Sequence, residues 1–172
     1  MKYKVLIVDD EPANLRALER LFRGRYDVLT AASGAAALQL LRQQDVALLI
    51  ADQRMPEMTG IELLKQTVTL RPRMVRIILT GYTDVNALVE AINSGQVYRY
   101  VTKPWSNEEL QLTVKRALEH YETNRNRWEL ELANQRLLAR LREIQLLATV
   151  SGAEEMTTFV PSDDAVPVLA QI

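Results

Sequence analysis

The chain has 172 residues, 48% of them hydrophobic and 25% charged, which is enough for one ordinary domain with an appendage or for two very small domains. The net charge of −1 argues against a strongly basic nucleic-acid surface, and the absence of cysteine excludes disulfides and thiolate metal sites. The sequence contains no signal-peptide pattern and no apolar run long enough for a membrane span, so we expect a soluble, cytoplasmic protein.

Short apolar runs rich in Val, Ile and Leu recur at fairly even spacing, at residues 3–8, 26–31, 46–51, 74–79 and 97–101. Such runs are typical of strands that are covered on both faces of a parallel sheet. Helical patterns separate the runs, and Thr59 and Ser106 each precede a Glu by three residues, a spacing typical of helix starts. The alternation predicts an α/β fold with a doubly wound five-stranded parallel sheet.

The sequence changes character after residue 106. No Pro or Gly occurs from there until Gly152, which predicts a long helix that continues the fifth helix of the domain. Heptad spacing favours a dimeric coiled coil, and an amphipathic helix folded back on its own domain is the alternative. Two offset seams can be read: Val114, Leu118, Tyr121, Arg125, Trp128 and Leu132, and then Leu130, Asn134, Leu137, Leu141, Ile144 and Ala148.

These patterns divide the chain into three expected parts. We expect a globular domain over residues 1–118 and a coiled-coil helix over 119–150. Residues 151–172 contain two prolines and no Lys or Arg, which indicates a flexible linker or the start of a truncated output segment.

Polar side chains follow the apolar runs, and in parallel sheets ligands bind at the carboxyl ends of strands. The first run is followed by Asp9, Asp10 and Glu11, the third by Asp52, the fourth by Thr80 and Gly81, and the fifth by Thr102, Lys103 and Pro104. Two carboxylates about 4 Å apart repel by roughly 4 kcal/mol at an effective dielectric constant near 20, so a cluster of three needs a cation. Mg²⁺ prefers such oxygen ligands.

The same residues narrow the chemistry of the site. No G-x-G-x-x-G or P-loop lysine follows the first run, which disfavours a dinucleotide site. A phosphoryl group can still bind through Mg²⁺, with Lys103 and Thr80 contacting its oxygens. One carboxylate is then left to act as a nucleophile and form an aspartyl phosphate. A Mg²⁺-dependent phosphohydrolase of haloacid-dehalogenase type is an alternative, but it needs Asp-x-Asp after the first strand, and here the acids are adjacent.

Together these residues resemble the CheY-like receiver domain of two-component response regulators, over residues 4 to 118. The adjacent acids, the Asp-x-x-Met-Pro-x-Met-x-Gly turn from Asp52 to Gly60, the Thr80–Gly81 pair and the Lys103–Pro104 pair occur in the family's order. The resemblance implies a flavodoxin-like fold with strand order 2-1-3-4-5. It also implies that a sensor histidine kinase donates a phosphoryl group to the chain.

The resemblance assigns the central roles to five residues. It implies that Asp52 is the phosphoacceptor and that Asp9, Asp10 and Asp52 bind Mg²⁺. The main-chain carbonyl of Arg54 is a further metal ligand in this reading, and Lys103 pairs with the phosphoryl group.

The resemblance also implies how phosphorylation is signalled. Thr80 hydrogen-bonds the phosphoryl group with help from the Gly81 amide, and Tyr100 occupies the switch-aromatic position. Tyr82, two residues after Thr80, is expected to flank the phosphoryl group and to limit the access of water. The peptide bond before Pro104 is expected to be cis.

The resemblance therefore implies a phosphoacceptor switch rather than an enzyme, one that signals through conformation and through a homodimer formed by the C-terminal helix. No output motif occurs in the sequence, and no direct nucleic-acid contact is evident. An alternative is that the chain is the N-terminal regulatory fragment of a larger signalling enzyme, such as a cyclase, phosphodiesterase or phosphatase.

Overall fold

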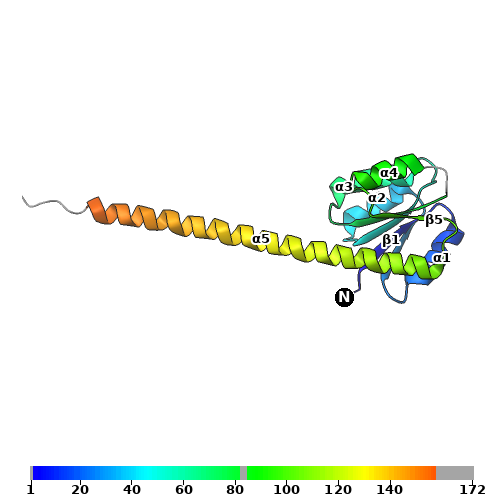
Figure 1. The fold of residues 1–172 in the computed structure, drawn as a ribbon, viewed down its shortest axis with the longest axis horizontal. Coiled ribbons are helices and arrows are strands. Elements are labelled where there is room, and N and C mark those ends of the chain that lie inside the picture. Colours follow the sequence, from blue (N-terminus) through cyan, green and yellow to red (C-terminus); the bar gives the residue numbers. More distant parts are fainter. Residues whose placement is uncertain (1, 82–84, 158–172) are drawn as a thin grey trace, which may run out of the picture. The chain divides into compact units, whose positions relative to one another are not determined.

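The computed structural model describes residues 2–81 and 85–157 and divides the chain into two compact units, Met1–Arg127 and Trp128–Ile172. Strands and helices alternate along the first unit (Figure 1). The strands are β1 (Lys4–Val8), β2 (Asp27–Ala31), β3 (Leu48–Asp52), β4 (Val75–Thr80) and β5 (Arg99–Thr102). The helices are α1 (Pro12–Phe22), α2 (Gly34–Gln43), α3 (Gly60–Leu70), α4 (Val85–Asn93) and α5 (Asn107–Thr157).

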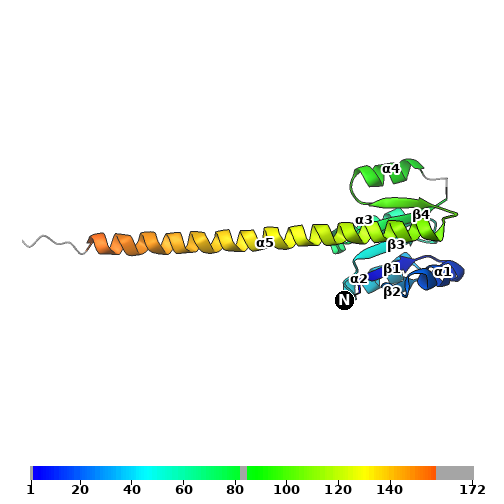
Figure 2. The same ribbon diagram turned by 60° about the horizontal axis from the view of Figure 1, so that its bottom comes forward.

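All five strands pair in parallel in the order β2-β1-β3-β4-β5, which confirms the predicted flavodoxin-like fold. Helices α2, α3 and α4 cover one face of the sheet, and α1 and the first turns of α5 cover the other (Figure 2). The helices lie on both faces of the sheet because each helix buries its apolar side against the strands. The order reverses between β1 and β3, so the carboxyl ends of these two strands border the expected ligand crevice.

Successive side chains of the central strands enter opposite halves of the core. On β1, Leu6 and Val8 pack with α2 and α3, whereas Val5 and Ile7 pack with α1 and α5. This two-residue period, with both faces buried, explains why the strands read as continuous apolar runs in the sequence.

Local hydrogen bonds set the helix starts that the sequence predicts. At α3 the Thr59 hydroxyl accepts the Glu62 N–H, and the Glu62 carboxylate accepts the Thr59 N–H at 2.8 Å, so the predicted capping box is confirmed. At α5 the Ser106 hydroxyl accepts the Glu109 N–H at 3.1 Å. Both caps satisfy amide groups that have no partner inside the helix.

Helix α5 differs from the prediction at both ends of the expected coiled coil. Val114, Leu118 and Tyr121 of the first seam are buried in the core of the first unit, so assigning them to a coiled coil was wrong. The helix also continues to Thr157, past residue 150 where we expected it to end, because the residues after Gly152 are good helix formers. Residues 158–172 lie outside the described part of the chain. Within the described part, no helix is both long and apolar enough to cross a membrane.

Candidate functional site

Asp52 ends β3 at the crevice edge of the sheet, and its side chain is buried. One carboxylate oxygen forms an ion pair with Lys103 Nζ at 2.5 Å, and the other accepts the main-chain N–H of Arg54 at 2.9 Å. The two side-chain oxygens of Asp52 therefore have different partners.

The turn after Asp52 fixes where that carboxylate lies. Gln53 donates its N–H to the Leu79 carbonyl at 2.8 Å, and its carbonyl accepts the Gly60 N–H at 3.1 Å. The Gln53 side-chain oxygen also accepts the Ile61 N–H at 3.1 Å, which ties the start of α3 to the end of β3. A Cβ on Gly60 would collide with the Asp52 carbonyl oxygen, so only glycine permits this close approach.

Asp9 follows β1 and lies beside Asp52, with 1% of its surface exposed. Its carboxylate accepts the Glu11 N–H at 2.8 Å and is 3.6 Å from Lys103 Nζ. The Asn14 amide lies 3.2 Å from one Asp9 oxygen and 3.1 Å from the other. Burial raises the pKa of Asp9 above 3.8, and the Asp52 charge adds to this, whereas the Glu11 N–H, Lys103 and Asn14 oppose it.

Lys103 joins the two carboxylates. Its main-chain N–H donates to the Thr80 carbonyl at 2.8 Å, and its ammonium lies 5.8 Å from the centre of the Trp105 ring. The Lys103–Pro104 peptide bond is cis, as the resemblance implies. The structure therefore brings Asp9, Asp52 and Lys103 together from the ends of three strands.

The other predicted site residues contribute less to this contact network. Thr80 is buried at the end of β4, and its hydroxyl donates to the Gly81 carbonyl at 2.7 Å rather than to Asp52. Asp10 is exposed next to Asp9. Tyr100, on β5, has 42% of its surface exposed. Tyr82 lies outside the described residues.

The carboxylates are suited to a divalent cation. Asp9 and Asp52 already converge on one cationic group, the Lys103 ammonium, which stands in for a cation between them. Among the described residues, no group of three acidic or His side chains lies at metal-binding spacing; Asp9 and Asp52 both pair with Lys103, and Asp10 is exposed next to Asp9. Hard carboxylate and carbonyl oxygens are the ligands that Mg²⁺ prefers, so the donor set fits this ion.

Sequence reasoning missed two residues that support the site. Asn14 is polar at the third position of α1, where its contact with Asp9 can be recognised only once the turn after β1 is known. Gln53 reads as an ordinary polar residue after a strand, yet it is buried with its amide oxygen bonded to α3.

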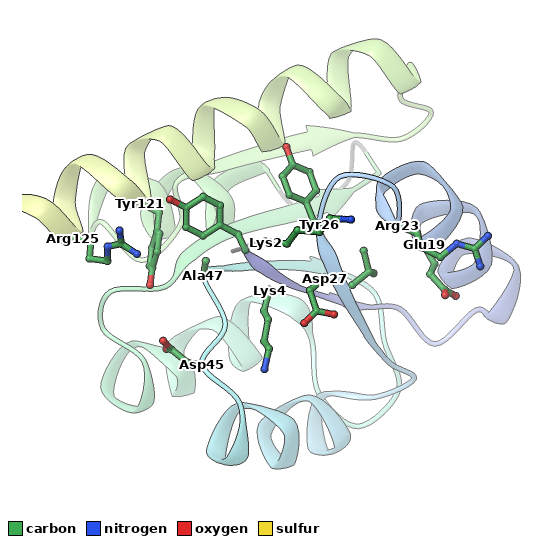
Figure 3. Close-up of a pocket in the computed structure, with 12 residues that line it drawn as sticks. Lys2, Lys4, Glu19, Arg23, Tyr26, Asp27, Asp45, Ala47, Tyr121 and Arg125 are labelled. Atoms are coloured by element: carbon green, nitrogen blue, oxygen red, sulfur yellow. The ribbon is translucent and has the colours of Figure 1, made fainter.

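A separate open groove of about 1020 Å³ lies at the amino ends of the strands (Figure 3). Asp9 and Asp52 lie at the opposite, carboxyl ends of β1 and β3. Tyr26 and Tyr121 line it together with cationic and acidic side chains, among them Lys4 and Asp27 at the start of β1 and β2. Its mixed charges favour no single ligand class, and we do not place the functional site there.

The chain belongs to the response regulator receiver domain family, which it matches over residues 5–115. It is 38% identical over 151 residues to the hydrogenase transcriptional regulatory protein HoxA of Cupriavidus necator, an alignment that covers 87% of this chain. The chain spans 31% of the length of that regulator, so the match concerns one part of a longer protein.

Two solved structures extend the likeness to the fold. A CheY-like response regulator receiver domain protein from Methanospirillum hungatei is 30% identical with a TM-score of 0.68, covering 72% of this chain and 99% of that chain. An adenylate cyclase from Rhodopirellula baltica is 30% identical with a TM-score of 0.74, covering 76% of this chain and 97% of that chain.

Family membership identifies a two-component response regulator, and neither the phosphohydrolase nor the enzyme-fragment alternative is favoured. Receiver domains of this family are phosphoacceptor switches that generally depend on Mg²⁺.

Proposed function

We propose that this chain accepts a phosphoryl group on Asp52 from the phosphohistidine of a sensor histidine kinase. A carboxylate oxygen of Asp52 attacks phosphorus while the bond from phosphorus to the donor nitrogen breaks, and the imidazole leaves. The observation that carries the proposal is the 2.5 Å ion pair between Lys103 and the buried carboxylate of Asp52.

The residues around Asp52 have complementary roles. Lys103 pairs with the Asp52 carboxylate before the reaction and with the phosphoryl oxygens after it. Its positive charge stabilises the negative charge on these oxygens because it is already held beside Asp52. Asp9, Asp10, Asp52 and the Arg54 main-chain carbonyl are the groups that would hold Mg²⁺. When bound, Mg²⁺ supplies a positive charge that neutralises the phosphoryl oxygens.

We propose that Thr80 and Tyr100 couple phosphorylation of Asp52 to a conformational change at the protein surface. The Thr80 hydroxyl exchanges its bond to the Gly81 carbonyl for one to the phosphoryl oxygen, which is the stronger acceptor. The space that this movement opens allows the exposed ring of Tyr100 to turn inward, which changes the surface around β5.

We further propose that the second unit forms a homodimer. Leu130, Leu137, Leu141 and Ile144 repeat with heptad spacing, and between 50% and 68% of each side chain's surface is exposed in the single chain. A second copy of the helix buries this stripe in a two-stranded coiled coil, in which Asn134 is the polar residue that favours a defined register.

Intact mass after incubation with acetyl phosphate and Mg²⁺ tests the phosphoacceptor proposal. We expect one added phosphoryl group on the wild-type chain and on Glu57→Gln, an exposed acid in the same turn. Asp52→Asn is expected to gain no phosphoryl group. An equal adduct on Asp52→Asn would refute the assignment.

A further inference from the structure

The side-chain amide of Asn14, in the first turn of α1, contacts both carboxylate oxygens of Asp9. Its side-chain amide lies 3.2 Å and 3.1 Å from the two Asp9 oxygens and 3.2 Å from Glu11 Oε2. Asn14 is half-buried in the first turn of α1, and its amide donates to carboxylate oxygens rather than satisfying the free N–H groups of the helix start, so these three contacts indicate a further role.

The Asn14 amide controls how the Asp9 carboxylate is rotated. Contacts to both oxygens define the plane of the carboxylate, and the Glu11 N–H fixes one of these oxygens at 2.8 Å. Each carboxylate oxygen has two lone pairs, so these donors leave acceptor capacity on the side that faces Asp52 and Lys103.

From these contacts we propose that Asn14 is a positioning residue that orients the Asp9 carboxylate for the divalent cation. A carboxylate that is already held in one orientation loses less conformational entropy when it binds the cation, so binding is tighter. Loss of such outer contacts commonly weakens metal binding 10- to 100-fold. The inference rests on the Mg²⁺ site of the proposed function and adds a residue to it.

Calorimetric titration of the full chain with Mg²⁺, without any phosphoryl donor, tests this role. We expect the Mg²⁺ dissociation constant to rise about tenfold in Asn14→Ala and in the near-isosteric Asn14→Leu. Asn124→Ala is the matched control, because it removes the same amide from an exposed position on α5 and should leave the constant unchanged.

Two further measurements separate positioning from a purely structural role. Thermal unfolding of metal-free Asn14→Ala should show only a modest loss of stability, because the better helix propensity of Ala partly offsets the lost contacts with Asp9. The Mg²⁺ concentration for half-maximal adduct formation from acetyl phosphate should rise about tenfold, while the rate at saturating Mg²⁺ stays near wild type.

The outcomes are distinguishable. An Mg²⁺ dissociation constant within twofold of wild type in both Asn14 variants would overturn the inference, as would a loss of thermal stability without weaker binding. Absence of Mg²⁺ binding by the wild-type chain itself would instead overturn the proposed Mg²⁺ site, on which the inference rests.

Discussion

Lys103 lies between two buried carboxylates, and this arrangement sets the charge balance of the site. One ammonium cannot neutralise Asp9, Asp10 and Asp52, so the three aspartates keep a surplus of two negative charges. A divalent cation matches that surplus, and the proposed Mg²⁺ requirement follows from the charge as well as from the ligand type.

Asp9 supplies a pH-dependent test. Its pKa in the folded protein is raised above the ordinary value of 3.8. The folded protein therefore binds a proton at Asp9 more readily than the unfolded chain, so the ionised carboxylate lowers folded stability at neutral pH. We expect Asp9→Asn to stabilise the metal-free protein at pH 7 by on the order of 1 kcal/mol, measured by urea unfolding.

The pH dependence of this gain has a definite sign. The gain should shrink as the pH falls through the folded-state pKa of Asp9, because the wild-type carboxyl then becomes neutral as well. The control is Asp27→Asn, which changes an exposed aspartate on β2. A gain that is constant down to pH 3.8, or a loss of stability at neutral pH, would contradict burial as the dominant influence on Asp9.

At the scale of elements, the junction between β3 and α3 positions the phosphoacceptor. Gly60→Ala places a methyl group against the Asp52 carbonyl and 2.9 Å from Ile78 Cδ1, so the start of α3 must shift. Overpacking of this kind costs about 2 kcal/mol, and we expect slower adduct formation on Asp52 as well. Thermal unfolding and the acetyl phosphate reaction measure the two effects.

Gly24→Ala is the matched control for this substitution, because a Cβ at Gly24 meets no atom within 4 Å. It should keep wild-type stability and reactivity. If Gly60→Ala behaved like Gly24→Ala, the close approach of α3 to Asp52 would have no importance for the site.

The elements themselves were largely readable from the sequence. Apolar runs predicted all five strands; those of β1, β3 and β4 are nearly continuous because both faces of these central strands are buried. The capping box at Thr59 marked the start of α3. Arg76 could not be foreseen, because a charge in the fourth run argues against burial. It is 6% exposed and instead bonds the Thr67, Arg71 and Met74 carbonyls around the end of α3, and burial lowers its pKa to about 10.

The first seam of α5 was predicted to lie in a coiled coil, and its first three positions are instead buried in the domain core. Heptad spacing and the pattern of a helix packed on a sheet differ little over three turns, so Val114, Leu118 and Tyr121 fit both. Only the location of the sheet distinguishes core packing from a coiled coil at these positions. The side-chain contacts of Asn14 were equally invisible, since they depend on how the turn after β1 folds.

For the whole molecule, we expect a dimer that depends on the second seam of α5, which contains Leu130, Leu137, Leu141 and Ile144. Leu137→Lys places two like charges opposite one another in the coiled-coil core and should weaken the dimer about 100-fold, equivalent to roughly 3 kcal/mol. Leu146→Lys is the control, because Leu146 is five residues after Leu141, on the side of the helix away from the seam. Sedimentation equilibrium of the full chains measures both.

A monomeric wild-type chain at micromolar concentration would refute the dimer and leave the phosphoacceptor site untouched. Equal weakening by both Lys variants would instead indicate an interface on a different side of the helix. The two results separate the existence of the dimer from its register.

Asp52 is the proposed carrier of the phosphoryl group, and locating that group in the phosphorylated chain tests this assignment. Borohydride reduction of the chain phosphorylated by acetyl phosphate and Mg²⁺ converts the modified aspartate to homoserine, which peptide mass spectrometry locates. We expect homoserine at Asp52 alone. Homoserine at Asp9 or Asp10, or none at Asp52, would contradict it.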